Sequence, residues 1–157
     1  MEEKSEQLIP RWLGYLGLLP FVVPTIFLFF DFHHLYMWRH FLIAYGAVIL
    51  SFVGALQWAF AMLMDLSVKM RRWTFVWSVM PALAAWVALS VSQWLACIIL
   101  PIGFGFALLM DQRLARSAVL PSWYLPLRYQ LTIVAMSCLI VAGLLIRFNG
   151  FFYLMIN

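Results

Sequence analysis

The chain has 157 residues, of which 66% are hydrophobic and only 10% are charged. A typical soluble domain is about half apolar and roughly a quarter charged, and a small domain has too little interior to bury such an excess. The composition therefore excludes a soluble globular enzyme, and it excludes a disordered chain, which needs low hydrophobicity and high net charge. We expect one all-α domain over residues 1–157, a polytopic membrane protein.

The first predicted element is a membrane-spanning helix over residues 12–30, a run without charge. Such a helix needs about 20 mostly apolar residues. The segment before it carries Glu2, Glu3 and Glu6, which have the wrong sign for the start of a signal peptide. We therefore expect this first run to remain in the mature protein as a membrane anchor.

The following loop, residues 31–40, contains all three histidines of the chain. If the loop is helical, His33, Tyr36, Met37 and His40 share one face. Imidazole and thioether groups suit copper, and imidazole alone suits haem or zinc, although no established ligand spacing such as HExxH is present. One hypothesis is a metal or haem site, and the alternative is an interfacial loop among lipid headgroups. The candidate ligands are His33, His34, Met37 and His40.

The second predicted helix, residues 41–64, carries a seam of small and polar residues. Ser51, Gly54, Trp58 and Ala61 are separated by three or four residues, so they share a face with Gln57 beside it. Small residues let helix backbones approach closely, and an amide can donate a hydrogen bond across the contact. We interpret the seam as a buried packing surface, because an amide cannot act as an acid or base near pH 7.

Residues 73–110 form an uncharged run of 38 residues. One helix of that length would extend over about 57 Å, compared with roughly 30 Å for the hydrocarbon core, so the run must fold back. The polar residues at 90–93 predict the turn, between helices at 74–90 and 93–110. Pro81 and Pro101 indicate either broken helices that line a transport site or ordinary kinks.

The fifth helix is predicted over residues 126–147, and the loop before it is basic. One interpretation is a dock for anionic lipid or a partner protein, formed by Asp111, Arg113, Trp123, Tyr124 and Arg128. The alternative is topology-setting charge with an Asp–Arg contact. After residue 147, Asn149-Gly150 predicts a turn before a short apolar segment.

The positions of the charges predict orientation. Eight Lys and Arg residues lie on the side of the N-terminus and two on the other side, which places the N-terminus in the cytoplasm and the C-terminus outside. The cations form no basic helix face, so we expect no nucleic-acid partner. Cys97 and Cys138 lie in apolar runs and favour neither a disulfide nor a zinc site.

Ionisable groups are missing from the middle of the predicted spans. Asp31, Asp65 and Asp111 fall at helix ends, where we expect water or headgroups to reach them. Proton relays and ion-coupled transporters place such groups at membrane depth. Their absence here weakens the hypotheses of a proton pump and of a coupled transporter. No Ser–His or paired-Asp arrangement lies in the spans, so we expect no enzyme.

Four segments carry a family resemblance: ILSFVGALQWAFAM (49–62), MPALAAWVALSV (80–91), LLMDQRLA (108–115) and LPSWYLPLRYQLT (120–132). Together with an Asp-x-Arg motif followed by Trp-Tyr-x-x-x-Arg, they resemble the family of transmembrane protein 69. That family is of unknown function and is found in bacteria and mitochondria. The resemblance implies a five-helix inner-membrane protein without an established activity. Gln57 stands where the family's Gly-Gly-x-His-Trp-Gly stretch has its histidine.

The leading hypothesis is a non-enzymatic protein of the bacterial inner membrane, an accessory, assembly or stabilising subunit of a larger complex. Its partners would be the lipid bilayer and either other membrane proteins or further copies of itself. No cofactor is required by the sequence. The alternatives are a small-solute or lipid transporter or channel, and a metal- or haem-handling protein that uses the histidine loop.

Overall fold

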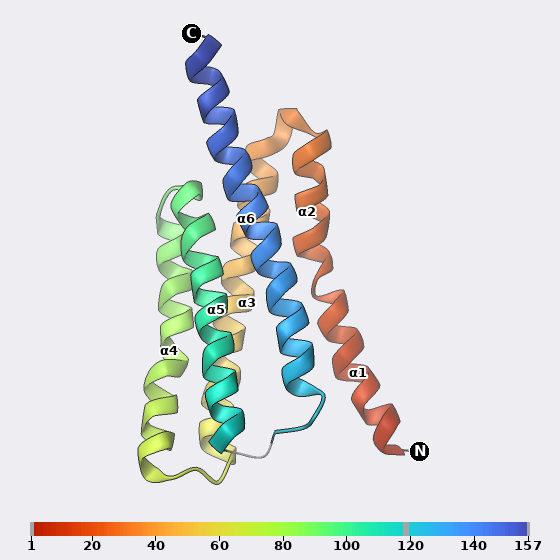
Figure 1. Ribbon diagram of the computed structural model, residues 1–157, viewed down its shortest axis with the longest axis vertical. Coiled ribbons are helices and arrows are strands. Elements are labelled where there is room, and N and C mark those ends of the chain that lie inside the picture. Colours follow the sequence, from red (N-terminus) through yellow and green to blue (C-terminus); the bar gives the residue numbers. More distant parts are fainter. Residues whose placement is uncertain (1, 118–119, 157) are drawn as a thin grey trace.

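The structure is a computed structural model that describes the backbone of residues 2–117 and 120–156 and the side chains of residues 8–117 and 120–147. The regular elements in this part of the chain are helices, arranged as a bundle of long rods (Figure 1). They are α1 (Glu2–Leu16), α2 (Leu19–Phe30), the 3-10 helix η1 (Phe32–His34), α3 (Leu35–Leu63), α4 (Val68–Ser90), α5 (Gln93–Ser117) and α6 (Tyr124–Ile156).

Five helical segments are long and apolar enough to cross a membrane. They are Leu8–Phe30, Phe32–Leu63, Val68–Ser90, Gln93–Ser117 and Tyr124–Arg147. The predictions of an all-helical fold and of five spans are confirmed. Several helices extend beyond the uncharged runs. Charged side chains in the last one or two turns of a membrane helix can reach the interface, so a charge does not have to end the helix. The fold-back inside the long uncharged run lies at Val91 and Ser92.

The first span is broken between α1 and α2, at Gly17 and Leu18. Pro20 at the start of α2 has no N–H to donate, and the Phe21 N–H bonds to the Leu18 carbonyl instead of continuing the α1 ladder. The carbonyl of Gly17 accepts a hydrogen bond of 2.8 Å from the hydroxyl of Tyr45 on α3. A neighbouring helix thus satisfies a backbone group at the break, which is what lipid surroundings require.

The centre of the bundle is α3, which contacts α2, α4, α5 and α6. Apolar side chains from α2, α3, α5 and α6 meet around it, among them Phe21, Leu50, Leu100 and Leu139. At Gly54 the backbone of α3 lies close to that of α4, because a Cβ atom there would lie 2.5 Å from the backbone oxygen of Ser78. The core therefore depends on small residues as well as on large apolar ones.

The predicted packing seam on α3 is partly wrong. Gly54, Gln57 and Ala61 are buried, but Ser51 is only half-buried and Trp58 is 46% exposed. The buried face is displaced around the helix because four helices surround α3, and helical spacing alone cannot say which stripe they cover. Trp58 instead packs edge-on against Phe75 of α4, with ring centroids 5.0 Å apart.

The turn predicted at Asn149-Gly150 is also wrong, because α6 continues through both residues to Ile156. In lipid a helix keeps its backbone groups bonded within itself, and glycine is tolerated there more readily than in water. Figure 1 shows the last turns of α6 extending beyond the rest of the bundle. The side chains of this end lie outside the described residues.

Candidate functional site

A buried ion pair joins α5 to α6 and is connected to α3. The carboxylate of Asp111 on α5 accepts a hydrogen bond of 2.7 Å from Nε of Arg128 on α6. Nε2 of Gln57 on α3 lies 3.4 Å from the other carboxylate oxygen and donates to the Ala107 carbonyl at 3.3 Å. Asp111 has 0% of its surface exposed, Gln57 2% and Arg128 7%.

Helical spacing places each of these side chains inside the bundle. Asp111 follows Phe104 and Ala107 on the buried face of α5, one turn apart at each step. On α6, Tyr124, Arg128 and Thr132 are separated by four residues and all three are buried. The ion pair therefore lies on the inward faces of both helices.

The inward face of α6 also holds polar atoms without a partner among the described residues. They are the Tyr124 hydroxyl, Nη2 of Arg128 and the Thr132 hydroxyl. A buried donor without a partner costs about 1 to 3 kcal/mol. The pair itself is compensated in charge, and breaking such a pair costs more than forming it gains. The ion pair therefore serves as a link between α5 and α6, and this link is stable only while both charged side chains are present.

These positions correct two expectations. Water was expected to reach Asp111 at a helix end, but α5 continues to Ser117 and the carboxylate is enclosed. The predicted dock is not one surface, because Asp111, Tyr124 and Arg128 are buried, Trp123 is half-buried and only Arg113 is exposed. The Asp–Arg contact of the alternative interpretation does form, between Asp111 and Arg128.

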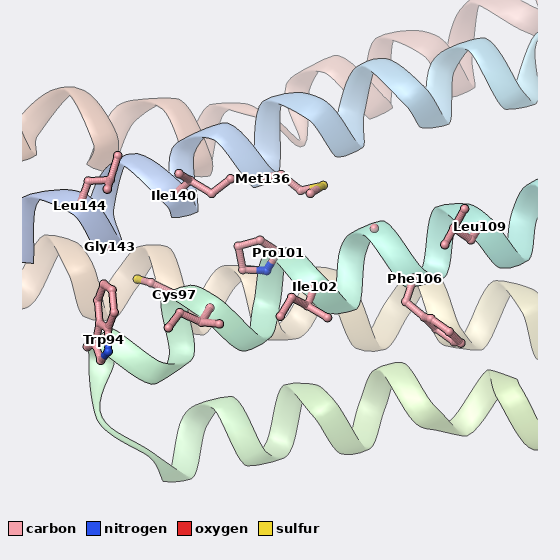
Figure 2. Close-up of a pocket in the computed structure, with 12 residues that line it drawn as sticks. Trp94, Cys97, Pro101, Ile102, Phe106, Leu109, Met136, Ile140, Gly143 and Leu144 are labelled. Carbon is pink, nitrogen blue, oxygen red and sulfur yellow. The ribbon is translucent and has the colours of Figure 1, made fainter. Parts of the chain in front are cut away.

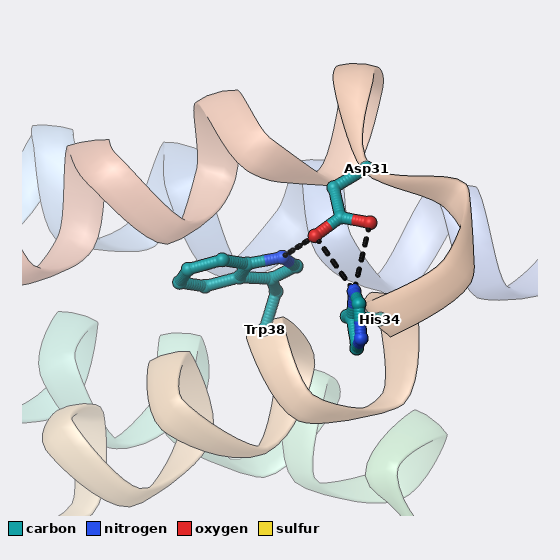
Figure 3. A network of polar contacts seen from close by, with 3 residues as sticks. All are labelled: Asp31, His34 and Trp38. Atoms are coloured by element: carbon teal, nitrogen blue, oxygen red, sulfur yellow. Dashed lines mark hydrogen bonds and ion pairs between the residues drawn. The ribbon is translucent and has the colours of Figure 1, made fainter.

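The histidine loop holds a second polar cluster (Figure 3). In Figure 1 the connection from α2 to α3 lies at the end of the bundle opposite the N-terminus. Nδ1 of His34 lies 3.0 Å from both carboxylate oxygens of Asp31, and the Trp38 indole N–H donates to the same carboxylate at 3.0 Å. The Trp38 hydrogen bond, followed by that of His34, lowers the pKa of Asp31 from its ordinary value of 3.8. The cluster ties η1 to the first turn of α3.

The structure does not gather the predicted metal ligands into one site. Among the described residues, no three His, Cys, Asp or Glu side chains lie close enough together to hold a metal ion. The ring of His40 stacks on Tyr36 with centroids 6.5 Å apart, while Nδ1 of His34 faces Asp31. His33 is exposed and Met37 is 38% exposed. Metal or haem binding by this loop stays a prediction.

An apolar groove lies between α5 and α6 on the outside of the bundle (Figure 2). Its volume is about 600 Å³. Small or short residues, Pro101, Gly105 and Gly143, lie along it between larger side chains such as Trp94 and Met136. Pro101, for which the sequence predicts either a broken helix or an ordinary kink, lies in this groove. The groove also needs α6, and no sequence pattern gives the position of α6 along α5.

Comparison with known proteins agrees with these membrane features. Residues 7–144 match the family described as "Protein of unknown function (DUF3429)". The chain is 35% identical over 133 residues to transmembrane protein 69 of Xenopus tropicalis, across 82% of this chain and 51% of that protein.

The corresponding protein of Mus musculus is 30% identical over 136 residues, across 85% of this chain and 55% of that protein. The chain thus spans about half the length of the curated relatives it matches. No solved structure matches it significantly. The chain therefore belongs to the DUF3429 family, multi-pass membrane proteins of unknown function, and is a distant homologue of transmembrane protein 69.

Proposed function

We propose that this protein is a non-enzymatic accessory subunit of a membrane complex, and that it binds a membrane-spanning helix of its partner protein in the groove between α5 and α6. The observation that carries the proposal is the groove itself. Helices associate in lipid through close packing at small residues, and Gly105 and Pro101 lie in the groove with exposed apolar side chains on either side.

The length of the groove favours a helix over a single lipid chain. Its wall on α5 runs from Trp94 to Leu109, which corresponds to about 22 Å of helix. One leaflet of the hydrocarbon core is roughly 15 Å thick, half of the whole. The groove therefore continues past the membrane midplane, where an acyl chain from one leaflet ends and a membrane-spanning helix continues.

The buried ion pair supports a scaffolding role. Asp111, Arg128 and Gln57 connect three of the helices and are enclosed by them. The pair holds α5 and α6 in one relative position, and the walls of the groove belong to these same two helices. A fixed groove loses less conformational freedom on binding than a flexible one, and such preorganisation favours association.

We place the protein in the bacterial inner membrane, with the end that carries eight Lys and Arg residues in the cytoplasm. In the structure the N-terminus of the chain, the α3–α4 connection and the start of α6 lie at one end (Figure 1). Arg39 lies in the first turns of α3 and Arg147 in the second half of α6, so both lie toward the other end. The positive-inside rule supports this orientation.

Site-specific photo-crosslinking in native membranes tests the proposal. A photoreactive residue at Ile102, in the groove, is expected to give one protein adduct of defined mass. The matched control is Leu83, an exposed apolar residue of α4 at a similar distance from the turn at Val91. Filling the groove with Gly105→Leu is expected to abolish the adduct at Ile102 and the higher band on a blue-native gel.

Three results contradict the proposal. The first is equal crosslinking from Ile102 and Leu83, and the second is adducts with lipid alone. The third is a monomer on native gels of gently solubilised membranes. An adduct of twice the mass of the chain assigns the groove to a second copy instead of a different partner.

A further inference from the structure

We propose that a groove at the eight-cation end, formed by Trp73 on α4 and by Arg113 and Arg116 on α5, binds the phosphate headgroup of an anionic phospholipid. This groove is separate from the one between α5 and α6 and does not depend on the partner helix. Its volume is about 350 Å³, and Met70 and Ser117 complete its lining.

The geometry of the two arginines suits a phosphate group. The guanidinium carbon of Arg113 lies 5.4 Å from the centre of the Trp73 ring, so a cation–π contact orients that side chain. Arg116 follows three residues later and lies on the same side of the helix. Guanidinium groups bind phosphate through paired N–H donors, and both arginines are exposed.

The charge around the groove is positive because the nearest acidic residue is already paired. Asp111 lies less than one turn before Arg113, but it is enclosed and bonded to Arg128. Lys69 and Arg72 on the first turns of α4 add two exposed cations at the same end. Asp65, in the α3–α4 connection, is the remaining acidic side chain of this end that the structure describes.

The position of the groove identifies the source of the phosphate. It lies where the spans Val68–Ser90 and Gln93–Ser117 end, which is the depth of the lipid headgroups. Deeper along the same helices, the half-buried ring of Trp77 on α4 packs against Phe106 on α5, with ring centroids 4.9 Å apart. A phospholipid bound there would contact cations at its headgroup and apolar rings along its acyl chain.

Native mass spectrometry of the purified full chain tests the site. The probes are phosphatidylglycerol, which is anionic, and phosphatidylcholine, which has no net charge. We expect phosphatidylglycerol to bind more tightly, and the Arg113→Gln/Arg116→Gln variant to bind it roughly 10- to 30-fold more weakly. The Arg113→Lys/Arg116→Lys variant keeps the charge but loses the paired N–H donors, and its affinity for phosphatidylglycerol is expected to lie between those of the native chain and the double Gln variant.

The matched control is Arg147→Gln. Arg147 lies over a tryptophan as Arg113 does, 5.9 Å from the ring centre of Trp94, at the opposite end of the bundle. Its removal is expected to leave phosphatidylglycerol binding within about twofold. Equal losses from Arg147→Gln and from the double Gln variant overturn the proposal, since binding is then a matter of net charge. Displacement of the lipid by millimolar inorganic phosphate overturns it too, because the site then takes free phosphate.

Discussion

Asp111 shows what one charged side chain does inside this bundle. Its carboxylate has no exposed surface, and Nε of Arg128 donates to it at 2.7 Å. Removal of one partner leaves the other charge buried and unpaired, which lowers the free energy of unfolding by about 3 to 5 kcal/mol. Replacement of both partners by apolar residues of similar volume often leaves that free energy unchanged. The stability of the bundle should therefore depend on the match between the two residues more than on either residue.

The first prediction concerns this pair. Asp111→Leu is expected to lower the free energy of unfolding in detergent by about 3 to 5 kcal/mol, and the double variant Asp111→Leu/Arg128→Met by much less. Arg11→Gln, at an exposed position of α1, is the control and should change stability by about 0.5 kcal/mol at most. If the stability loss of the double variant equals the sum of the losses of Asp111→Leu and Arg128→Met, the two residues are not energetically coupled.

The second prediction concerns Asp31. Its pKa is lowered by hydrogen bonds from Trp38 and His34, so the stabilisation from the charged form is present above pH 3.8 and is lost as pH falls through the lowered pKa. Trp38→Phe removes the indole donor and is expected to move the pKa of Asp31 upward. Carboxyl ¹³C NMR of both proteins measures it, with His33→Ala as control. An unchanged pKa in Trp38→Phe contradicts the assignment.

Residue identity alone did not place either cluster. The uncharged run ends at Met110, so Asp111 was expected near water, and only the continuation of α5 and the approach of α6 enclose it. Gln57, for which its small neighbours predict a place beside a helix contact, is buried. Its approach to Asp111 depends on α5, 54 residues further along the chain.

At the scale of helices, the contact between α3 and α4 depends on Gly54. A Cβ atom at this position would lie 2.5 Å from the Ser78 backbone oxygen, which cannot move aside as a flexible side chain can. At Gly105, by contrast, the nearest atom would be the end of Met136 at 3.7 Å, an ordinary contact. The two glycines therefore differ in what they contribute, although the sequence shows both inside apolar spans.

The third prediction follows from this difference. Gly54→Ala is expected to destabilise the protein by about 1 to 3 kcal/mol, because overpacking forces the helices apart. Gly105→Ala is the matched control and should be close to neutral. Thermal unfolding in the same detergent measures both. A smaller loss at Gly54 than at Gly105 would show that α3 and α4 do not pack this closely.

At the scale of the whole molecule, eight cations at one end and two at the other define a polar axis. The fourth prediction is that Ser122→Cys, between α5 and α6, reacts with an impermeant maleimide from the cytoplasmic side, and Ser92→Cys from the opposite side. Both serines are exposed, and the native Cys97 and Cys138 are buried. The native chain is the control, and the reverse pattern of labelling contradicts the proposed orientation.

From the amino-acid sequence we could predict the class of the molecule, the number of candidate spans and the place where the long uncharged run folds back. These properties depend on the length and polarity of local segments compared with the thickness of a bilayer. Tertiary packing selects which helix faces are buried, since Gln57 is 2% exposed and Trp58, the next residue, is 46% exposed. It also decided that Asp111 pairs with Arg128 and that α5 and α6 leave a groove, because both depend on how distant helices pack around α3.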